Sequence, residues 1–267
     1  MKASVLGLDG KAAKEVELPS QFAEAYRPDV IRRAFLAEAS EKLQPKGNFP
    51  LAGNQTTAEY YGRRHAWRQT INTGRSRLPR EKIAKGRSGR VRIVPHSVKG
   101  RRAHPPKVMK TIIERINPKE RRLAIRSAVA ATGIPEAVKA RGHRLSAGKL
   151  PVVVSDSIQS IKKSSEAKKI LDALGFAQDL QRASDGRKPR SGIARLRKGG
   201  VRTPRSVLIV IAKDDGISKA ARNIPGVEVA QVKDLNMNEL APGGNAGRLT
   251  AWSEGAVAAM GKEKLFY

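Results

Sequence analysis

The strongest strand signal in the chain is the run Val207-Leu208-Ile209-Val210-Ile211, in which five aliphatic side chains follow one another without a polar break. A strand with one face in water alternates apolar and polar residues, whereas a strand covered on both faces is apolar throughout. A second run of this kind is Val152-Val153-Val154. Together they predict strands of a parallel sheet that is buried between two layers of helices.

Helix and strand signals alternate around these two runs, as they do in βα units. Ala167, Ile170, Leu171 and Leu174 form one apolar helical stripe, which we expect to end at Gly175. We expect further helices at 28–44, 118–132, 218–222 and 253–260, and further strands at 3–8, 16–18, 227–232 and 249–252. The predicted fold is α/β, with an open, Rossmann-like, mostly parallel sheet flanked by helices and interrupted by a long extended basic internal loop.

The start of the helix at 118–132 has a recognisable sequence. Asn117 is a suitable N-cap, Pro118 suits the first turn, and Glu120 is placed to complete a capping box. Gly133 is the expected terminator. Of the helix's arginines, Arg121, Arg122 and Arg126 are expected to face outward.

Residues 45–107, here called the arm, cannot form a core of their own. They contain 16 Lys or Arg residues against two acids, Glu59 and Glu81, and only nine of the 63 residues are Leu, Ile, Val or Phe. Such a composition does not support independent folding. A net charge of +14 (16 minus 2) within one segment repels itself unless a polyanion neutralises it. We therefore predict that an external polyanion orders the arm.

A second basic segment covers residues 182–205, with nine Lys or Arg, one acid, four Gly and two Pro. It lacks apolar periodicity, so we expect a loop that is ordered by phosphate. The predicted organisation is a globular α/β domain (1–44 and 108–267), the arm (45–107) and this second loop within the globular domain.

The charge of the whole chain, +29 over 267 residues, favours nucleic acid as the partner. Arginine forks onto phosphate oxygens, glycine permits close backbone approach, and the aromatic side chains of the arm can stack on unpaired bases. The predicted RNA-binding residues are Arg63, Arg64, Trp67, Arg68, Arg75, Arg77, Arg80, Lys82, Lys85, Arg87, Arg90, Arg92, Lys99, Arg101, Arg102, His104, Lys107, Arg187, Lys188, Arg190, Arg195, Arg197, Lys198, Arg202 and Arg205.

Other classes of function have little support in the sequence. No dinucleotide fingerprint, P-loop or nucleophile elbow is present, and Asp156 after the strand at 152–154 is better explained as a helix cap than as a catalytic acid. His65, His96 and His104 have no metal-ligand spacing, so we expect no metal, cofactor or small-molecule substrate. We expect His143 to pack or cap locally. There is no apolar run of membrane-spanning length and no cysteine, which fits a reducing cytosol and no membrane partner.

Several motifs follow one another in a family-specific order: Val98–Lys107 at the end of the arm, Lys119–Ala128, Ala140–His143, Pro151–Asp156, Ala220–Gly226, Leu240–Gly244 and Arg248–Thr250. With these motifs the chain resembles the universal large-subunit ribosomal protein four, in its archaeal and eukaryotic branch. The resemblance covers nearly the whole chain. Because no long lysine-rich extension follows Tyr267, we expect the archaeal type.

The resemblance implies a structural constituent of the large ribosomal subunit in the cytoplasm, without catalysis. It implies binding to 23S-type rRNA, contacts with neighbouring ribosomal proteins and a role in assembly. In this family the arm's tip forms part of the peptide exit tunnel, where it meets the nascent chain, so the tunnel-wall candidates are Arg63, Arg64, His65, Trp67, Arg75 and Arg77. The alternative is a free-standing nucleic-acid chaperone or chromatin-type binding protein.

Overall fold

The computed structural model describes residues 1–53, 55–56, 58–60, 65, 71–82, 88–91, 94–144 and 150–267, with the side chains of Lys82 and Ser88 outside the description. The chain divides into two compact units. The first, here called the body, consists of Met1–Lys42 and Ile113–Tyr267, and the second, the arm unit, is Leu43–Ile112.

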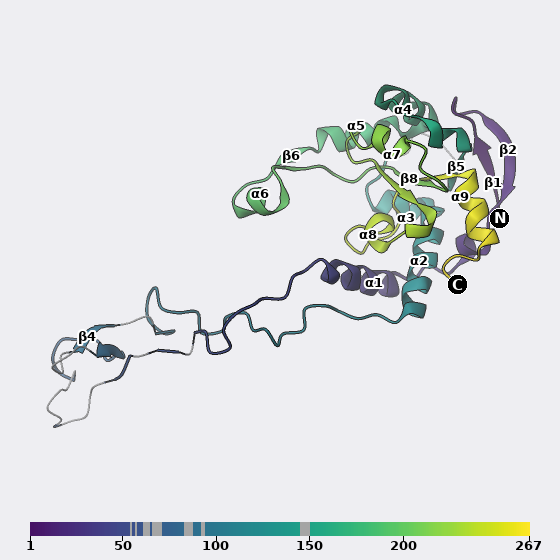
Figure 1. Ribbon diagram of the computed structural model, residues 1–267. Helices are drawn as coiled ribbons and strands as arrows, with labels where there is room; N and C mark the ends of the chain where they lie inside the picture. The colour runs from purple at the N-terminus through teal and green to yellow at the C-terminus, as the bar shows by residue number, and fades with distance from the viewer. Residues whose placement is uncertain are drawn as a thin grey trace. The chain divides into compact units, whose positions relative to one another are not determined.

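A six-stranded sheet forms the centre of the body, in the order β2-β1-β5-β10-β8-β9 (Figure 1). All neighbours from β1 to β9 are parallel, and only the edge strand β2 runs antiparallel to β1. The strands are β1 Lys2–Leu6, β2 Ala12–Glu17, β5 Val152–Val154, β8 Leu208–Ile211, β9 Glu228–Gln231 and β10 Thr250–Ser253. The predicted open, mostly parallel α/β sheet is confirmed.

Alternate residues of the central strands enter two separate cores. Val153 and Val210 point into one apolar cluster, whereas Val152 and Ile209 point into the other. All residues of β5 and β8 are buried, as expected for strands covered on both faces.

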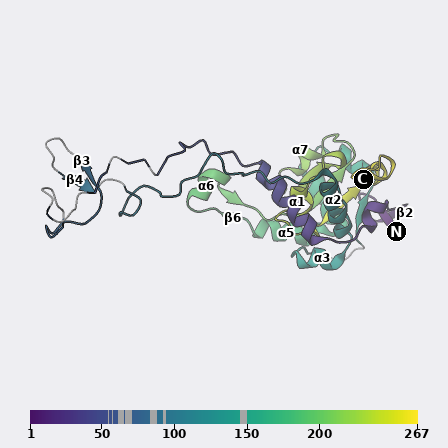
Figure 2. The same cartoon turned by 90° about the horizontal axis from the view of Figure 1, so that it is seen from below.

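Helices cover both faces of the sheet. The first core is closed by η1 Ser20–Ala23, α1 Pro28–Glu41, α2 Pro118–Thr132, η5 Val232–Asp234, α8 Met237–Leu240 and α9 Glu254–Lys262. The second core is closed by α3 Pro135–Ala140, η3 Asp156–Ser160, α4 Ser164–Leu171, η4 Asp172–Phe176, α5 Ala177–Asp185 and α7 Ile217–Ala221. In the first layer α1 and α2 pack against each other (Figure 2).

Details of α2 differ from the expectation, although its bounds are as predicted. The side chain of Asn117 makes no capping hydrogen bond, and Glu120 accepts one from Arg33 (3.2 Å) in place of completing a capping box. Arg126 does not face outward freely, because its guanidinium donates to Glu24 (2.7 Å) and to the carbonyl of Phe266. Glu120 therefore bonds to a residue of α1 and not to the start of its own helix.

The expectation of a plain loop at 182–205 is wrong. Arg182 belongs to α5, and beyond it β6 Lys188–Pro189 pairs antiparallel with β7 Val201–Arg202, with α6 Ile193–Lys198 between them. We call residues 187–205, which contain these elements, the basic hairpin. No residue of α6 is buried, so its regular structure comes from backbone hydrogen bonds and not from apolar packing.

Candidate nucleic-acid interface

In the arm unit, residues 48–53 and Gln55 lie beside the stretch 101–107. Side chains link them by donating to backbone carbonyls, from Asn48 to Pro106, from Lys107 to Pro50 and from Arg101 to Gln55. Gly53 has a φ of +86° and lies so close to Arg102 that a Cβ would stand 2.2 Å from its carbonyl oxygen. The two stretches are therefore joined by polar contacts with main-chain atoms.

A small hairpin lies further along the arm unit, where β3 Arg80–Lys82 pairs with β4 Ser88–Val91. Arg80 organises it. Its backbone forms an antiparallel bridge to Glu59, and its guanidinium donates to the carbonyl of Gly89 (3.3 Å) and to the hydroxyl of Ser76 (3.1 Å). Arg80 thus has a structural task in addition to the predicted contact with RNA.

The structure describes about half of the RNA-binding residues predicted in the arm. The exposed ones are Arg75, Arg77, Arg90, Lys99, Arg101, Arg102 and His104. Arg80 and Lys107 are half-buried. Outside the description are Arg63, Arg64, Trp67, Arg68, Lys85, Arg87 and Arg92, together with the side chain of Lys82. Of the tunnel-wall candidates, His65, Arg75 and Arg77 are described, and all three are exposed.

The basic hairpin presents most of its cations to solvent. The exposed residues are Arg187, Lys188, Arg195, Arg197, Lys198, Arg202 and Arg205. Arg190 is half-buried, since its backbone pairs with Gly200 and its Nε donates to the carbonyl of Val201 (3.2 Å). The segment with β6 and α6 projects from the rest of the body (Figure 1), and these exposed cations all belong to it or flank it.

A buried carboxylate anchors the base of this hairpin to the body. Asp179 is fully buried on α5 and accepts hydrogen bonds from Ser206 (2.6 Å), Arg182 (2.9 Å), His143 (3.1 Å) and the backbone of Arg144 (3.0 Å). Burial alone would raise the pKa of Asp179, but these hydrogen bonds outweigh it and hold the pKa well below its usual range. Asp179 therefore stays ionised and ties α5 to Ser206, which directly follows the hairpin, and to the segment 143–144.

His143 packs locally, as predicted, but in a deeper position than a surface cap. Burial lowers its pKa, and the charges of Arg182 and Arg141 act in the same direction, while Asp179 opposes them. The imidazole is thus neutral and donates to the carboxylate through Nδ1.

A buried guanidinium supports the amino edge of the sheet next to the hairpin. Arg248 has no exposed surface, and it donates to Glu228 (2.6 Å) and to the carbonyls of Ser206 (3.0 Å) and Glu239 (2.8 Å). Arg205 at the hairpin's end contacts the second oxygen of Glu228. Two arginines therefore share one carboxylate.

Sequence analysis did not single out Asp179, Arg248 or Arg222 for this region. The position of Arg248 could have drawn attention in the sequence, because it stands immediately before the predicted strand 249–252. Nothing in the sequence pointed to Asp179, since its partners come from three separate places in the chain, at 143–144, 182 and 206.

The carboxyl edge of the sheet, where an α/β enzyme would bind its substrate, is occupied by structural hydrogen bonds. Asp156 accepts from Gly255 (2.7 Å) and Gln159 (2.8 Å), so it caps α9, a helix about 100 residues away, and not the helix that it begins. Gln159 also accepts from the backbone of Lys213 (3.1 Å). Within the described part of the chain, no group of three or more His, Cys, Asp or Glu could hold a metal.

Replacing Asp156 by Asn is expected to have a small effect. The amide keeps an oxygen that can accept from Gly255, and only the charge beside the helix N-terminus is lost, which costs about 0.3–1 kcal/mol of unfolding free energy. Urea unfolding measures it, with Ser253→Ala, which removes the other α9 cap, as the comparison at about 1 kcal/mol. A loss of stability clearly larger than that caused by Ser253→Ala would contradict this role as one of two caps of α9.

A model of the ribosomal protein L4/L1 family matches residues 16–263. The chain belongs to this family. It is 46% identical over 257 residues to large ribosomal subunit protein uL4 of Methanocaldococcus jannaschii, which covers 96% of this chain and 97% of the relative. It is 48% identical to uL4 of Methanothrix thermoacetophila (95% and 96% covered) and 43% identical to uL4 of Archaeoglobus fulgidus (98% and 99%).

These matches confirm the resemblance drawn from the sequence motifs, including its archaeal branch. Family membership makes the chain a structural ribosomal protein of the cytoplasmic ribosome and not an enzyme, as predicted. No helix in the described residues has the length and apolar character needed to cross a membrane.

Proposed function

We propose that the chain binds the 23S-type rRNA of the large subunit through two basic elements, the arm (45–107) and the segment 182–205, and thereby supports subunit assembly. The observation that carries the proposal is the net charge of +14 on an arm in which only nine of 63 residues are Leu, Ile, Val or Phe, in a chain that belongs to a ribosomal-protein family. Its relatives are named large ribosomal subunit proteins.

The described geometry supports phosphate contacts as the main binding mode. Seven predicted binding residues of the arm and seven of the basic hairpin are exposed. In the arm unit the side-chain contacts of 101–107 with Pro50 and Gln55 use main-chain oxygens, and the side chains of Arg101 and Arg102 are exposed, so both can reach phosphate. The body supplies a rigid support for the hairpin through Asp179 and Ser206.

The tunnel-wall role is the finer part of the proposal. We infer that Arg63, Arg64, His65, Trp67, Arg75 and Arg77 line the peptide exit tunnel and meet the nascent chain, and that other surfaces of the body contact neighbouring ribosomal proteins. His65, Arg75 and Arg77 are exposed, as this role requires.

Salt dependence tests the proposal. About ten phosphate contacts would release about 0.7–0.9 counterion each, so the slope of log affinity against log salt is expected to be about −7 to −9. Filter binding of the intact protein to deproteinised large-subunit rRNA between 50 and 400 mM KCl measures it. An affinity that hardly changes with salt would contradict rRNA binding through phosphates.

A further inference from the structure

Two pockets of the body share one wall, the turn Asn223-Ile224-Pro225 between α7 and β9. The turn is fixed against the base of the basic hairpin. Ser206 donates from its backbone to Gly226 (2.8 Å), and Gly226, with a φ of +78°, lies so close to Pro204 that a Cβ would stand 2.4 Å from its carbonyl oxygen. The shared wall is therefore a well-positioned part of the body.

The first pocket, of about 410 Å³, is lined by three arginines, Arg187 and Arg205 from the hairpin and Arg222 from the end of α7. Its acid, Glu228, already contacts Arg205 through one oxygen and the buried Arg248 through the other. Burial and the charge of Arg205 lower the pKa of Arg248 to about 9. Positive charge thus exceeds negative charge at this pocket, which favours an anion.

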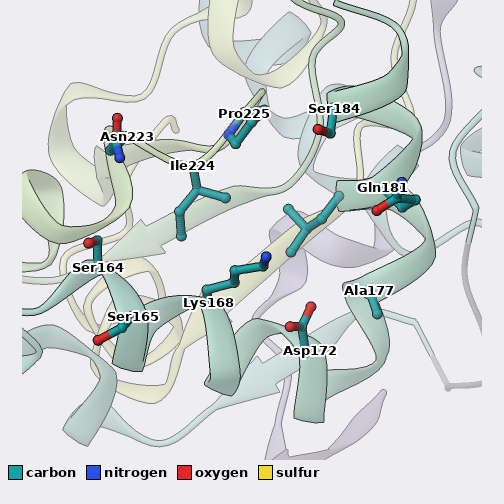
Figure 3. Close-up of a pocket in the computed structure, with 11 residues that line it drawn as sticks. Ser164, Ser165, Lys168, Asp172, Ala177, Gln181, Ser184, Asn223, Ile224 and Pro225 are labelled. Carbon is teal, nitrogen blue, oxygen red and sulfur yellow. The ribbon is translucent and has the colours of Figure 1, made fainter.

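The second pocket, of about 670 Å³, has a different chemistry (Figure 3). Ile224 and Pro225 give it an apolar wall, and Leu180 of α5 is a further apolar lining residue. Gln181 and Ser184 stand on the same helix, and the Lys168 side chain reaches into the space between α4 and the turn (Figure 3). A hollow that combines apolar side chains with a few hydrogen-bonding groups is suited to a small organic group such as a nucleoside. Asp172 is the one acid among its described lining residues, and Lys168 is the one base.

We propose that the two pockets together bind one unpaired nucleotide of RNA, with its phosphodiester among Arg187, Arg205 and Arg222 and its nucleoside in the neighbouring pocket beside Ile224, Gln181 and Ser184. The proposal rests on the proposed function, because it takes the bound polyanion to be RNA. It adds a defined nucleotide site beside the basic hairpin, and it adds Arg222 to the binding residues.

The hollow shape distinguishes an unpaired nucleotide from a duplex. Duplex RNA offers phosphates and sugars on its surface while its bases stay stacked inside, so it would engage the arginines and leave the 670 Å³ pocket empty. An extruded nucleoside can enter that pocket, and its phosphate can face the arginines because the two pockets share the turn 223–225 as a wall.

Two substitutions separate the two halves of the site. Arg222→Gln removes an exposed cation and should lower rRNA affinity about tenfold, with the salt slope reduced in magnitude by about 0.7–0.9. Ser184→Trp, at an exposed position of α5, should block the nucleoside pocket, lowering affinity to a similar extent while leaving the slope unchanged. Arg32→Gln, an exposed arginine on α1, is the matched control and should have little effect.

Filter binding of the full-length variants to deproteinised large-subunit rRNA measures both the affinity and its salt slope. Thermal unfolding verifies that the variants are folded. The proposed nucleotide site is refuted if Arg222→Gln and Ser184→Trp bind rRNA like the Arg32→Gln control while the wild type keeps its steep salt dependence. The proposed function stands in that case. A salt-independent wild type would refute the proposed function itself.

A second experiment distinguishes RNA from a free nucleotide as the ligand of this site. Equilibrium dialysis of the wild type with a mixture of the four ribonucleoside monophosphates is expected to show only weak binding, above about 1 mM, because a single nucleotide lacks the other phosphate contacts. Micromolar binding that Arg222→Gln abolishes, without a change in rRNA affinity, would assign the site to a free nucleotide and overturn the proposal.

Discussion

Large subunits are expected to assemble poorly when residues 48–105 are replaced by a short Gly-Ser linker, although the body still folds. The deletion removes 14 of the arm's 16 cations, all except Lys46 and Lys107, and with them most of the proposed phosphate contacts. Both apolar clusters consist of body residues only, so the thermal unfolding of the body should change by no more than a few degrees. Sucrose gradients of cells that carry only the deleted form measure the assembly defect.

The matched control for this deletion shortens the basic hairpin by replacing residues 191–200 with a two-residue turn. It removes Arg195, Arg197 and Lys198, so we expect a smaller defect. Normal subunit profiles with the arm deleted would contradict the ribosomal role of the arm and favour a free-standing nucleic-acid chaperone or chromatin-type protein.

Asp179→Ala is expected to destabilise the body by about 3–5 kcal/mol, because it removes the charged partner of a buried network. The substitution leaves His143, Ser206 and the backbone of Arg144 without their acceptor. It also frees Arg182, which holds the carbonyl of Arg205 at the hairpin's base (2.7 Å). Urea unfolding measures the stability, and limited trypsin cleavage at Arg187 and Arg205 reports loosening of the hairpin.

The pH dependence gives a second readout of the same network. The folded pKa of Asp179 is lowered, so its stabilising contribution is present above the unfolded pKa of about 3.9 and is lost as the pH falls through the folded value. Wild type should therefore lose stability below about pH 4 more steeply than Asp179→Ala. Asp185→Ala, an exposed carboxylate on the same helix that contacts Gln181, is the control and should keep the wild-type profile. Equal stability of Asp179→Ala and this control would refute the anchoring role.

The amino-acid sequence by itself determined the parallel sheet and the helices around it. The runs 152–154 and 207–211 are apolar without a break, and such strands are stable only when covered on both faces. It also determined that residues 45–107 carry charge in place of a core, since composition alone limits how much apolar surface a segment can bury. The order of short motifs then indicated the family that the comparisons show.

Only the tertiary structure decided how particular polar residues are used. Asp156 caps α9 and not its own helix, Glu120 pairs with Arg33, and Asp179 has partners at 143–144, 182 and 206. These hydrogen bonds depend on packing between segments that local sequence does not encode. For the same reason Arg222 came to lie beside Arg187 and Arg205, although 35 residues of chain separate Arg222 from Arg187. Local patterns fix secondary structure, whereas the charges and cavities of a binding surface arise where segments remote in sequence meet.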